Sequence, residues 1–152
     1  MANRDIFRKP ITQSDDNHPK VGIIIVRECE TFAEKNLVPF IERLTELGCS
    51  PQHIYVREVA KLHDSIIMVQ YFAHYTDADS LIIMAPEERV LNTPALMQGI
   101  VQQQLQWNMF ITMGGKERAE DMEDMFLNMR EMEAQAPTFN AEEEEEPNIS
   151  FS

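Results

Sequence analysis

Charged side chains gather where four predicted strands end, and they are the residues of this chain that could do chemistry. Paired carboxylates can act as general acid and base, or can bind a hard divalent cation. The carboxyl ends of parallel strands meet at one rim of a sheet, which makes this rim the candidate ligand site. The alternative is a solvated rim whose charges pair with one another. The rim residues are Arg27, Glu28, Glu30, Arg57, Glu58, Glu87, Glu88, Arg89, Lys116 and Arg118.

Other candidate motifs are weaker. The turn Gly114-Gly115-Lys116 precedes a predicted helix and could cradle an anion on its backbone amides. A plain turn is the alternative, because the chain has no P-loop and no G-x-G-x-x-G sequence. His63 beside Asp64 lacks a second ligand at metal-binding spacing, so a capping or surface role is expected. Cys29 and Cys49 show no C-x-x-C spacing and are interpreted as reduced thiols. No metal or other cofactor is predicted, and no catalytic residue can be named.

Four short apolar segments predict the strands that must position the rim: residues 21–26, 53–57, 81–85 and 108–112. The run at 81–85 does not alternate with polar residues, which is typical of a strand buried on both faces. The segment at 53–57 is the least apolar and is expected at an edge. A helical pattern follows each strand. Right-handed crossovers then predict an α/β fold of three layers, with a four-stranded parallel sheet and helices on both faces, as in flavodoxin-like proteins.

Proline and glycine residues, together with the spacing of apolar residues, set the bounds of the predicted helices. Pro39 is tolerated in a first turn, which predicts a helix from about residue 37 that ends at Gly48 in a left-handed conformation. The second helix is predicted over 59–73, and its apolar surface, broadened by Tyr71, Phe72 and Tyr75, suggests a subunit contact. The third helix is expected to open near Pro94 and to bury Met97, Ile100, Val101 and Leu105. The last helix is expected to bury a methionine-rich stripe: Ala119, Met122, Met125, Phe126, Met129 and Met132.

The chain of 152 residues is interpreted as one domain with two tails. Residues 1–19 are expected to form a flexible N-terminal arm, in which Ile6, Phe7 and Ile11 could dock on a neighbour. Residues 20–135 are expected to form the α/β domain. Residues 136–152 are expected to be a disordered acidic tail, because the five glutamates Glu142 to Glu146 repel one another.

The net charge of −13 argues against nucleic acid or an anionic membrane as a partner. A cation or a basic protein is the more natural counterpart, and Glu142 to Glu146 could bind a basic protein or serve solubility alone. The chain has no apolar run of about 18 residues and no apolar signal-peptide region at its start. A cytoplasmic location is therefore expected.

The order and the lengths of the predicted elements match those of a known protein family. The matching parts are the segment from Lys20 to Arg27, the helix ending Leu47-Gly48, the segments 53–56 and 79–85, and the closing half through 108–112 and 117–119. Over about residues 20–130 the chain resembles the lumazine synthase family. That family forms 6,7-dimethyl-8-ribityllumazine, a riboflavin precursor, from a ribityl pyrimidine and a four-carbon ketone phosphate. It works without a metal at sites between the subunits of pentamers, some of which stack into icosahedral shells. The resemblance implies a homo-oligomer, a pentamer or larger.

The segments that would carry the family's catalysis differ in this chain. Glu28 and Cys29 stand where the family has an aromatic residue and an asparagine that orient the pyrimidine. Arg57-Glu58-Val59 lacks the glycine of the family's Gly-small-aromatic-Glu segment. Residues 87–91 lack the glycine, threonine and histidine that bind phosphate and move protons, and their two glutamates repel a phosphate. Arg118 loosely matches an anion-binding residue.

Two functions are compatible with this pattern. The first is a diverged, non-catalytic lumazine-synthase-like protein that self-assembles as a structural scaffold or binding module with an acidic tail. The second is an active but diverged lumazine synthase of riboflavin biosynthesis, or a small-molecule binder that uses the charged rim. The missing histidine and glycine beyond the third strand favour the first.

Overall fold

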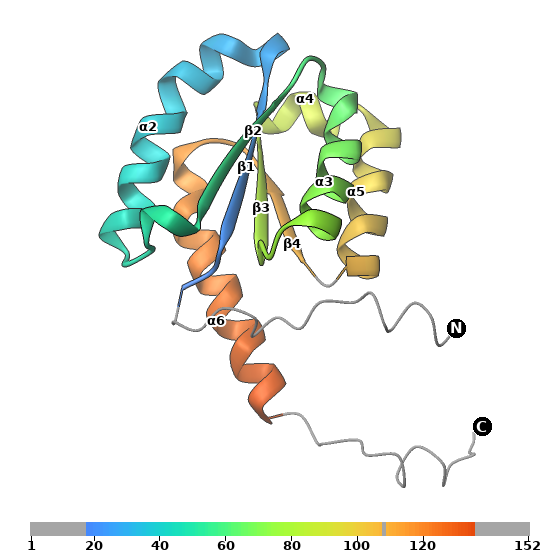
Figure 1. The fold of residues 1–152 in the computed structure, drawn as a ribbon. Helices are drawn as coiled ribbons and strands as arrows, with labels where there is room; N and C mark the ends of the chain where they lie inside the picture. Colours follow the sequence, from blue (N-terminus) through green and yellow to red (C-terminus); the bar gives the residue numbers. More distant parts are fainter. Residues whose placement is uncertain (1–17, 108, 136–152) are drawn as a thin grey trace, which may run out of the picture.

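Strands and helices alternate along the chain in a computed structural model that describes residues 18–107 and 109–135 (Figure 1). Short 3-10 turns lead into several of the helices, at Arg27–Cys29, Leu62–Asp64 and Lys116–Arg118. The regular elements are β1 (Val21–Val26), α2 (Glu30–Glu46), β2 (Ile54–Val59), α3 (Ser65–Tyr75), β3 (Ser80–Met84), α4 (Glu87–Leu91), α5 (Pro94–Trp107), β4 (Phe110–Met113) and α6 (Ala119–Gln135).

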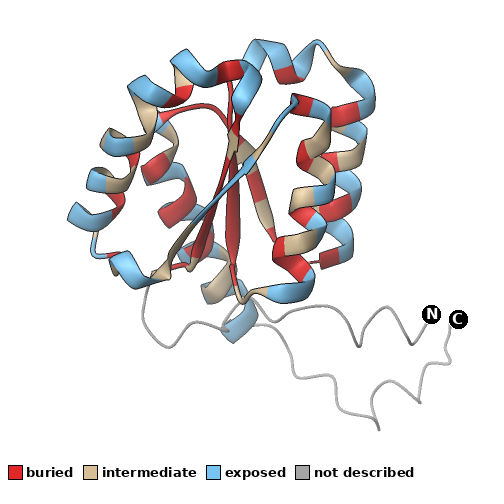
Figure 2. Ribbon diagram, turned by 45° about the horizontal axis from the view of Figure 1, so that its top comes forward, coloured by how far each residue is buried: buried red, intermediate tan, exposed pale blue. Residues whose placement is uncertain are grey.

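The four strands form one parallel sheet in the order β2-β1-β3-β4. Ile24 of β1 lies between Arg57 of β2 and Ile83 of β3, which fixes the register of the three strands. The predicted fold class is confirmed, and so is the edge position of the least apolar strand. β1 and β3 are buried almost throughout, whereas β2 is half-buried or exposed along its whole length (Figure 2).

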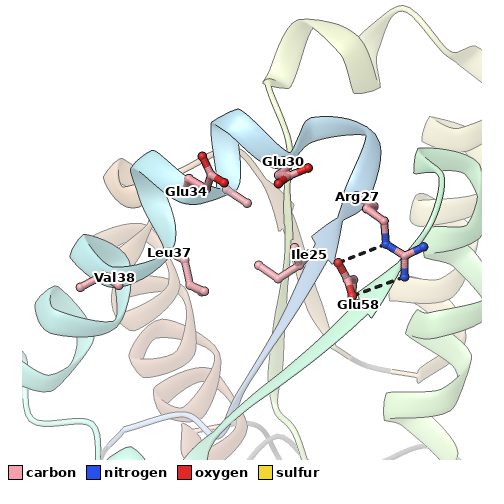
Figure 3. Close-up of a pocket in the computed structure, with 8 residues that line it drawn as sticks. Ile25, Arg27, Glu30, Glu34, Leu37, Val38 and Glu58 are labelled. Atoms are coloured by element: carbon pink, nitrogen blue, oxygen red, sulfur yellow. Dashed lines mark hydrogen bonds and ion pairs between the residues drawn. The ribbon is translucent and has the colours of Figure 1, made fainter.

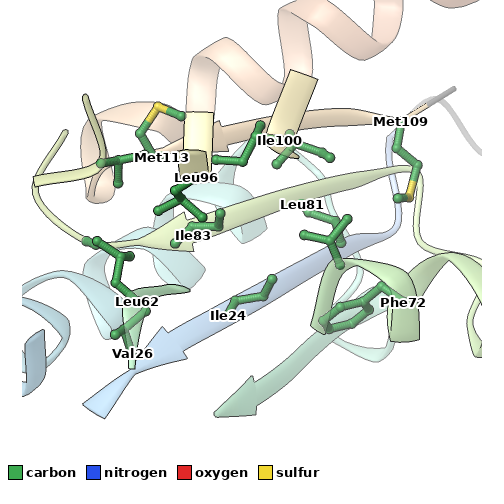
Figure 4. Packing of buried hydrophobic residues seen from close by; sticks show 14 of the residues in the cluster. Ile24, Val26, Leu62, Phe72, Leu81, Ile83, Leu96, Ile100, Met109 and Met113 are labelled. Carbon is green, nitrogen blue, oxygen red and sulfur yellow. The ribbon is translucent and has the colours of Figure 1, made fainter. Parts of the chain in front are cut away.

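Helices cover both faces of the sheet because successive residues of each strand point to opposite sides (Figure 1). On one face, Phe40 and Leu44 of α2 and Met122 of α6 pack against Ile23 and Ile82. On the other face, side chains of α3 and α5 pack against the alternate residues of β1 and β3 (Figure 4). That second cluster includes Ile24, Val26, Leu62, Phe72, Leu81, Ile83, Leu96, Ile100 and Met113.

Two glycines allow close packing and sharp turning. A Cβ on Gly22 of β1 would lie 2.5 Å from Leu81 and 2.7 Å from the Phe72 ring, so only glycine lets α3 approach the sheet here. Gly48 follows α2 with φ of 110°, a conformation that side chains disfavour. The predicted stop of the first helix at Gly48 is therefore confirmed.

The predicted start of the first helix, near residue 37, is wrong, because α2 begins at Glu30 and runs through Pro39. Pro39 cannot donate to the carbonyl of Lys35, which costs helix stability in isolation. Packing compensates: Ala33 is buried on the sheet, and the Asn36 side-chain oxygen accepts a hydrogen bond from the Lys116 amide at 2.9 Å. Tertiary contacts thus extend the helix upstream of its proline.

The second predicted helix is too long at its start. Val59 belongs to β2, and Leu62 lies in a 3-10 turn, so α3 begins only at Ser65. The residues between Val59 and Ser65 carry the turn that reverses the chain. The charged segment after Pro86 forms the short helix α4.

The predicted buried face of the third helix is partly wrong. Ile100 is buried as expected, but Val101 is 45% exposed and Leu105 is 64% exposed. The inward face instead contains Leu96, Gln103 and Trp107. Gln103 can be buried because its side-chain oxygen accepts a hydrogen bond from the Trp107 indole at 2.8 Å.

The predicted methionine stripe of the last helix is only half correct. Ala119, Met122 and Phe126 are buried, whereas Met125 and Met132 are exposed. The predicted arm and acidic tail fall mostly at residues 1–17 and 136–152, outside the described residues. Among residues 18–107 and 109–135, no helix is both long and apolar enough to cross a membrane.

Candidate functional site

The fold brings most of the predicted rim residues to the ends of the strands, where arginines and carboxylates pair. Arg27 follows β1 and lies 3.4 Å from the Glu58 carboxylate at the end of β2. Arg89 of α4 donates to the Glu28 carboxylate at 3.0 Å and to the Cys29 sulfur at 3.3 Å. These contacts cross from one loop to the next, which supports the interpretation of a self-paired rim.

Arg118 is the most constrained arginine of the rim. Its guanidinium donates to Glu87 at 2.8 Å, to Asp121 at 3.0 Å and to the Met113 carbonyl at 3.0 Å. The hydrogen bond to Asp121 raises the pKa of Arg118 above its ordinary value, so the side chain stays charged. With two carboxylates beside it, Arg118 lies in a site of net negative charge, which is unfavourable for a phosphate.

Several predicted rim residues, Arg57 and Glu88 among them, lie apart from these pairs. Arg57 points to the α3 face of β2, where its guanidinium carbon is 5.7 Å from the centre of the Tyr71 ring. This is a cation–π contact rather than part of a ligand site. Glu88 is exposed on α4 and forms no ion pair within the described part of the chain.

The predicted anion cradle at Gly114, Gly115 and Lys116 has its amides occupied by protein acceptors. The Gly114 amide donates to the Ile83 carbonyl at 3.2 Å, and the Gly115 amide donates to the Glu117 carboxylate at 3.2 Å. The Lys116 amide donates to Asn36, as described above. An anion would have to displace these acceptors, so the geometry favours the plain-turn interpretation.

The Cys29 thiol lies at the foot of the rim and is buried. Burial raises the pKa of this thiol, and the neighbouring Arg89 only partly offsets that effect. A thiol of raised pKa is a poor nucleophile at neutral pH. Within residues 18–107 and 109–135, no three His, Cys, Asp or Glu side chains are arranged to hold a metal ion.

A groove that the sequence did not predict lies between the first half of α2 and the ends of β1 and β2. We call it the α2/β2 groove; its volume is about 230 Å³. Figure 3 shows Ile25 and Leu37 facing each other across it, with the Arg27–Glu58 pair closing one end. It exists because β2 is an edge strand and α2 covers only the inner strands beside it. Its lining residues are Ile25, Arg27, Glu30, Ala33, Glu34, Leu37, Val38 and Glu58.

The outer surfaces of α3 and α5 form a second unusual region, which we call the uncharged face. Neither helix contains an Asp, Glu, Lys or Arg residue, although 26% of the whole chain is charged. Ile67 is 70% exposed and Tyr75 is 77% exposed on α3, in one row with the half-buried Tyr71. Val101 and Leu105 are the exposed apolar residues of α5.

The helices of the opposite layer, α2 and α6, each contain several charged residues. The charged residues of α2 are Glu30, Glu34, Lys35, Glu42, Arg43 and Glu46. Those of α6 include Glu120, Asp121, Asp124 and Glu131. The absence of charge on α3 and α5 is therefore not a general property of this acidic chain.

Comparison of the chain with protein-family models gives no match, and comparison with curated proteins gives none either. The case for a function therefore depends on the rim, the α2/β2 groove and the uncharged face.

Proposed function

We propose that this chain is a non-catalytic, self-assembling structural or binding module, and that its copies contact one another through the uncharged face. The observation that carries the proposal is the run of exposed apolar side chains on two helices that have no charged residue. A helix that faces water on one side ordinarily has charged residues there. Contact with a second protein surface removes that need.

A homo-oligomer is the proposed assembly. The exposed side chains of Ile67 and Tyr75 on α3 support it, whereas Phe72, which the sequence predicted to be part of the contact surface, is buried against the sheet. The resemblance to lumazine synthase implies a pentamer or larger. A contact between two different surface patches closes into such a ring when its rotation fits.

The rim supports a non-catalytic role more than a catalytic one. Arg27, Arg89 and Arg118 each pair with a carboxylate, so these three arginines are already partnered and are less available to a phosphorylated substrate. The amides of the turn at 114–116 are likewise occupied. The alternative, an active diverged lumazine synthase or a small-molecule binder at the rim, requires a substrate to break several of these contacts.

The mass of the protein in solution tests the assembly. We expect multi-angle light scattering at micromolar concentration to give the mass of a pentamer or larger. Ile67→Glu should raise the dissociation constant of the assembly about ten-fold or more, because a buried charge is costly. Tyr71→Glu should also weaken it. The control is Leu127→Glu, an exposed apolar residue of α6, which should leave the mass unchanged. A monomeric mass in moderate salt would refute the proposal.

Incubation with the two substrates of the lumazine synthase family tests the chemistry. We expect no lumazine product, because no proton-moving histidine follows β3 and two glutamates stand in its place. Turnover that disappears in Glu88→Ala would instead establish the enzyme interpretation.

The glutamates at 142–146 suggest the class of partner that such a module would bind. A run of carboxylates repeated on each subunit would gain avidity for a basic protein. We expect a defined basic protein, such as a histone, to bind the full chain at low salt and to lose affinity steeply as salt rises. Removal of residues 141–152 should abolish that binding and leave the thermal stability unchanged. Equal binding by the shortened chain would exclude the tail as the contact.

A further inference from the structure

The α2/β2 groove combines an apolar floor with unneutralised carboxylates. Ile25, Leu37 and Val38 form the floor, and Val38 is 58% exposed. Glu30 and Glu34 lie one helical turn apart along the edge and form no ion pair within the described residues. Arg27 is already paired with Glu58. The groove therefore fits an apolar group flanked by positive charges.

Residues 4–9 of this same chain have that chemistry. They read Arg-Asp-Ile-Phe-Arg-Lys, so that two large apolar residues lie between Arg4 and the pair Arg8-Lys9, with Asp5 as the one acidic residue. Three of the 13 basic residues of the chain lie in this short stretch. In a protein of net charge −13, such a segment is attracted to its own carboxylates.

The chain is long enough to bring this segment to the groove of its own domain. The described structure begins at His18, whose ring lies against Gly48 after α2 and hydrogen-bonds Glu123 of α6 at 2.9 Å. This point and the groove are on the same face of the sheet, at opposite ends of β1. A strand of six residues spans about 20 Å, and the nine peptide units from residue 9 to residue 18 span about 30 Å when extended.

Tethering favours the domain's own segment over that of a neighbour. A segment joined by a short linker is present at an effective concentration of about a millimolar, far above a micromolar protein concentration. We propose that residues 4–9 lie in the α2/β2 groove of their own domain, with Ile6 and Phe7 on the apolar floor and Arg4, Arg8 and Lys9 beside Glu30 and Glu34.

This contact would lie on the α2 side of the sheet, away from the uncharged face on α3 and α5. The inference goes beyond the proposed function, because it concerns a different surface and does not depend on assembly.

Cross-linking tests the proposal in the full chain. Asp5→Cys and Val38→Cys place thiols beside the segment and on the floor, whereas the native Cys29 and Cys49 are buried. We expect a short bismaleimide reagent to join positions 5 and 38 within one chain, seen as a cross-linked peptide in a product of monomer mass. Absence of that peptide would overturn the proposal.

Charge reversal provides the matched control. Glu34→Lys should slow the cross-link about five-fold, and Arg8→Glu added to it should restore much of the rate. Glu42→Lys, an exposed position further along α2 and outside the groove, should have no effect. A rate that is indifferent to Glu34→Lys would show that the groove carboxylates do not hold the segment, and would overturn the proposal.

Coexpression of two chains, one with Asp5→Cys and the other with Val38→Cys, distinguishes a neighbour's segment from the chain's own. We expect no cross-link between these chains; an efficient one would overturn the proposal in favour of exchange between copies. Repetition of the single-chain experiment with Ile67→Glu separates the groove contact from assembly. The cross-link should persist there at the same rate, whether or not the uncharged face joins subunits.

Discussion

The layer formed by α2 and α6 and the layer formed by α3 and α5 bury opposite faces of one sheet, yet they present different surfaces outward. The inward sides are alike: Phe40 and Phe72 are each fully buried, one in each layer. Outward, α2 and α6 carry charged residues toward both of their ends, whereas α3 and α5 carry none. The need to cover the sheet fixes only the inner stripe of a helix, so the outer stripe is free to specify water or a protein contact.

Exposed apolar residues also differ between the two layers. On the α2 side, Val38 lies next to Glu30 and Glu34, so an occupant must bring positive charge. On the α3 side, Ile67 and Tyr75 have no charged residue on their own helix. The groove thus suits a contact that salt weakens, and the uncharged face suits one that salt leaves intact or strengthens.

The largest expected effect tests whether the hydrophobic clusters on the two faces of the sheet contribute equally to the stability of the fold. Phe40→Ala and Phe72→Ala should each lower the free energy of unfolding by about 3–5 kcal/mol, because each leaves a cavity against the sheet. Urea unfolding followed by circular dichroism measures both, in the Ile67→Glu background so that assembly does not contribute. A loss confined to one variant would mean that one layer carries the stability of the fold.

A smaller effect concerns the polar cluster at the starts of the strands, on the α3 side. Asp77 accepts hydrogen bonds from Lys20 at 2.6 Å and from Tyr55 at 2.9 Å. Burial opposes ionisation of Asp77, but these hydrogen bonds outweigh it and hold the pKa of Asp77 below its usual value of 3.8. The hydrogen bond to Asp77 raises the pKa of Lys20 above 10.5.

Asp77 and Lys20 make the stability of the fold depend on pH at opposite ends of the pH range. The Asp77 contribution is present above pH 3.8 and is lost as the pH falls through the lower folded-state pKa. The Lys20 contribution is present below pH 10.5 and is lost as the pH rises through the higher folded-state pKa. Asp77→Asn should therefore cost about 1–2 kcal/mol at pH 7 and less in acid. Asp124→Asn, on the charged surface of α6, is the control, and an equal loss there would contradict the assignment.

The smallest expected effects compare two arginines of the rim. Arg118→Gln should cost about 1 kcal/mol, because its side chain is 24% exposed and has three acceptors. Arg27→Gln should cost less than about 0.5 kcal/mol, since its pair with Glu58 is long and exposed on both sides. Thermal unfolding measures both, and an Arg27 effect as large as that of Arg118 would show that the rim pairs are stronger than their geometry suggests.

The sequence predicted the sheet well because buried parallel strands leave a strong local signal. The apolar runs of β1 and β3 are enough to place these strands at the centre of the sheet, and the weak apolar pattern of β2 is enough to place it at the edge. The buried face of a helix was harder to predict where the helix has no charged residues. In α5, glutamines and apolar residues alternate without a charged side to orient them, so Val101 and Leu105 were assigned inward although they face outward.

The candidate site was predictable only as a set of residues at one rim. Which arginine pairs with which carboxylate depends on loop conformations that bring residues about 60 positions apart together, as for Glu28 and Arg89. The α2/β2 groove was missed because Pro39 had removed the first turns of α2 from the predicted helix. Glu30, Glu34 and Val38 at helical spacing were the signal that could have revealed it.

The central position of β1 has a consequence for synthesis on the ribosome. β1 is made before both of its partners, which lie about 33 residues later in β2 and about 59 residues later in β3. At about 5–20 residues per second, the apolar stretch Val-Gly-Ile-Ile-Ile-Val waits roughly 3 to 12 seconds before both neighbours have been synthesised. During that interval it is an open template for any other nascent strand, so the yield of folded protein should depend on translation speed and on chaperones that bind short apolar segments.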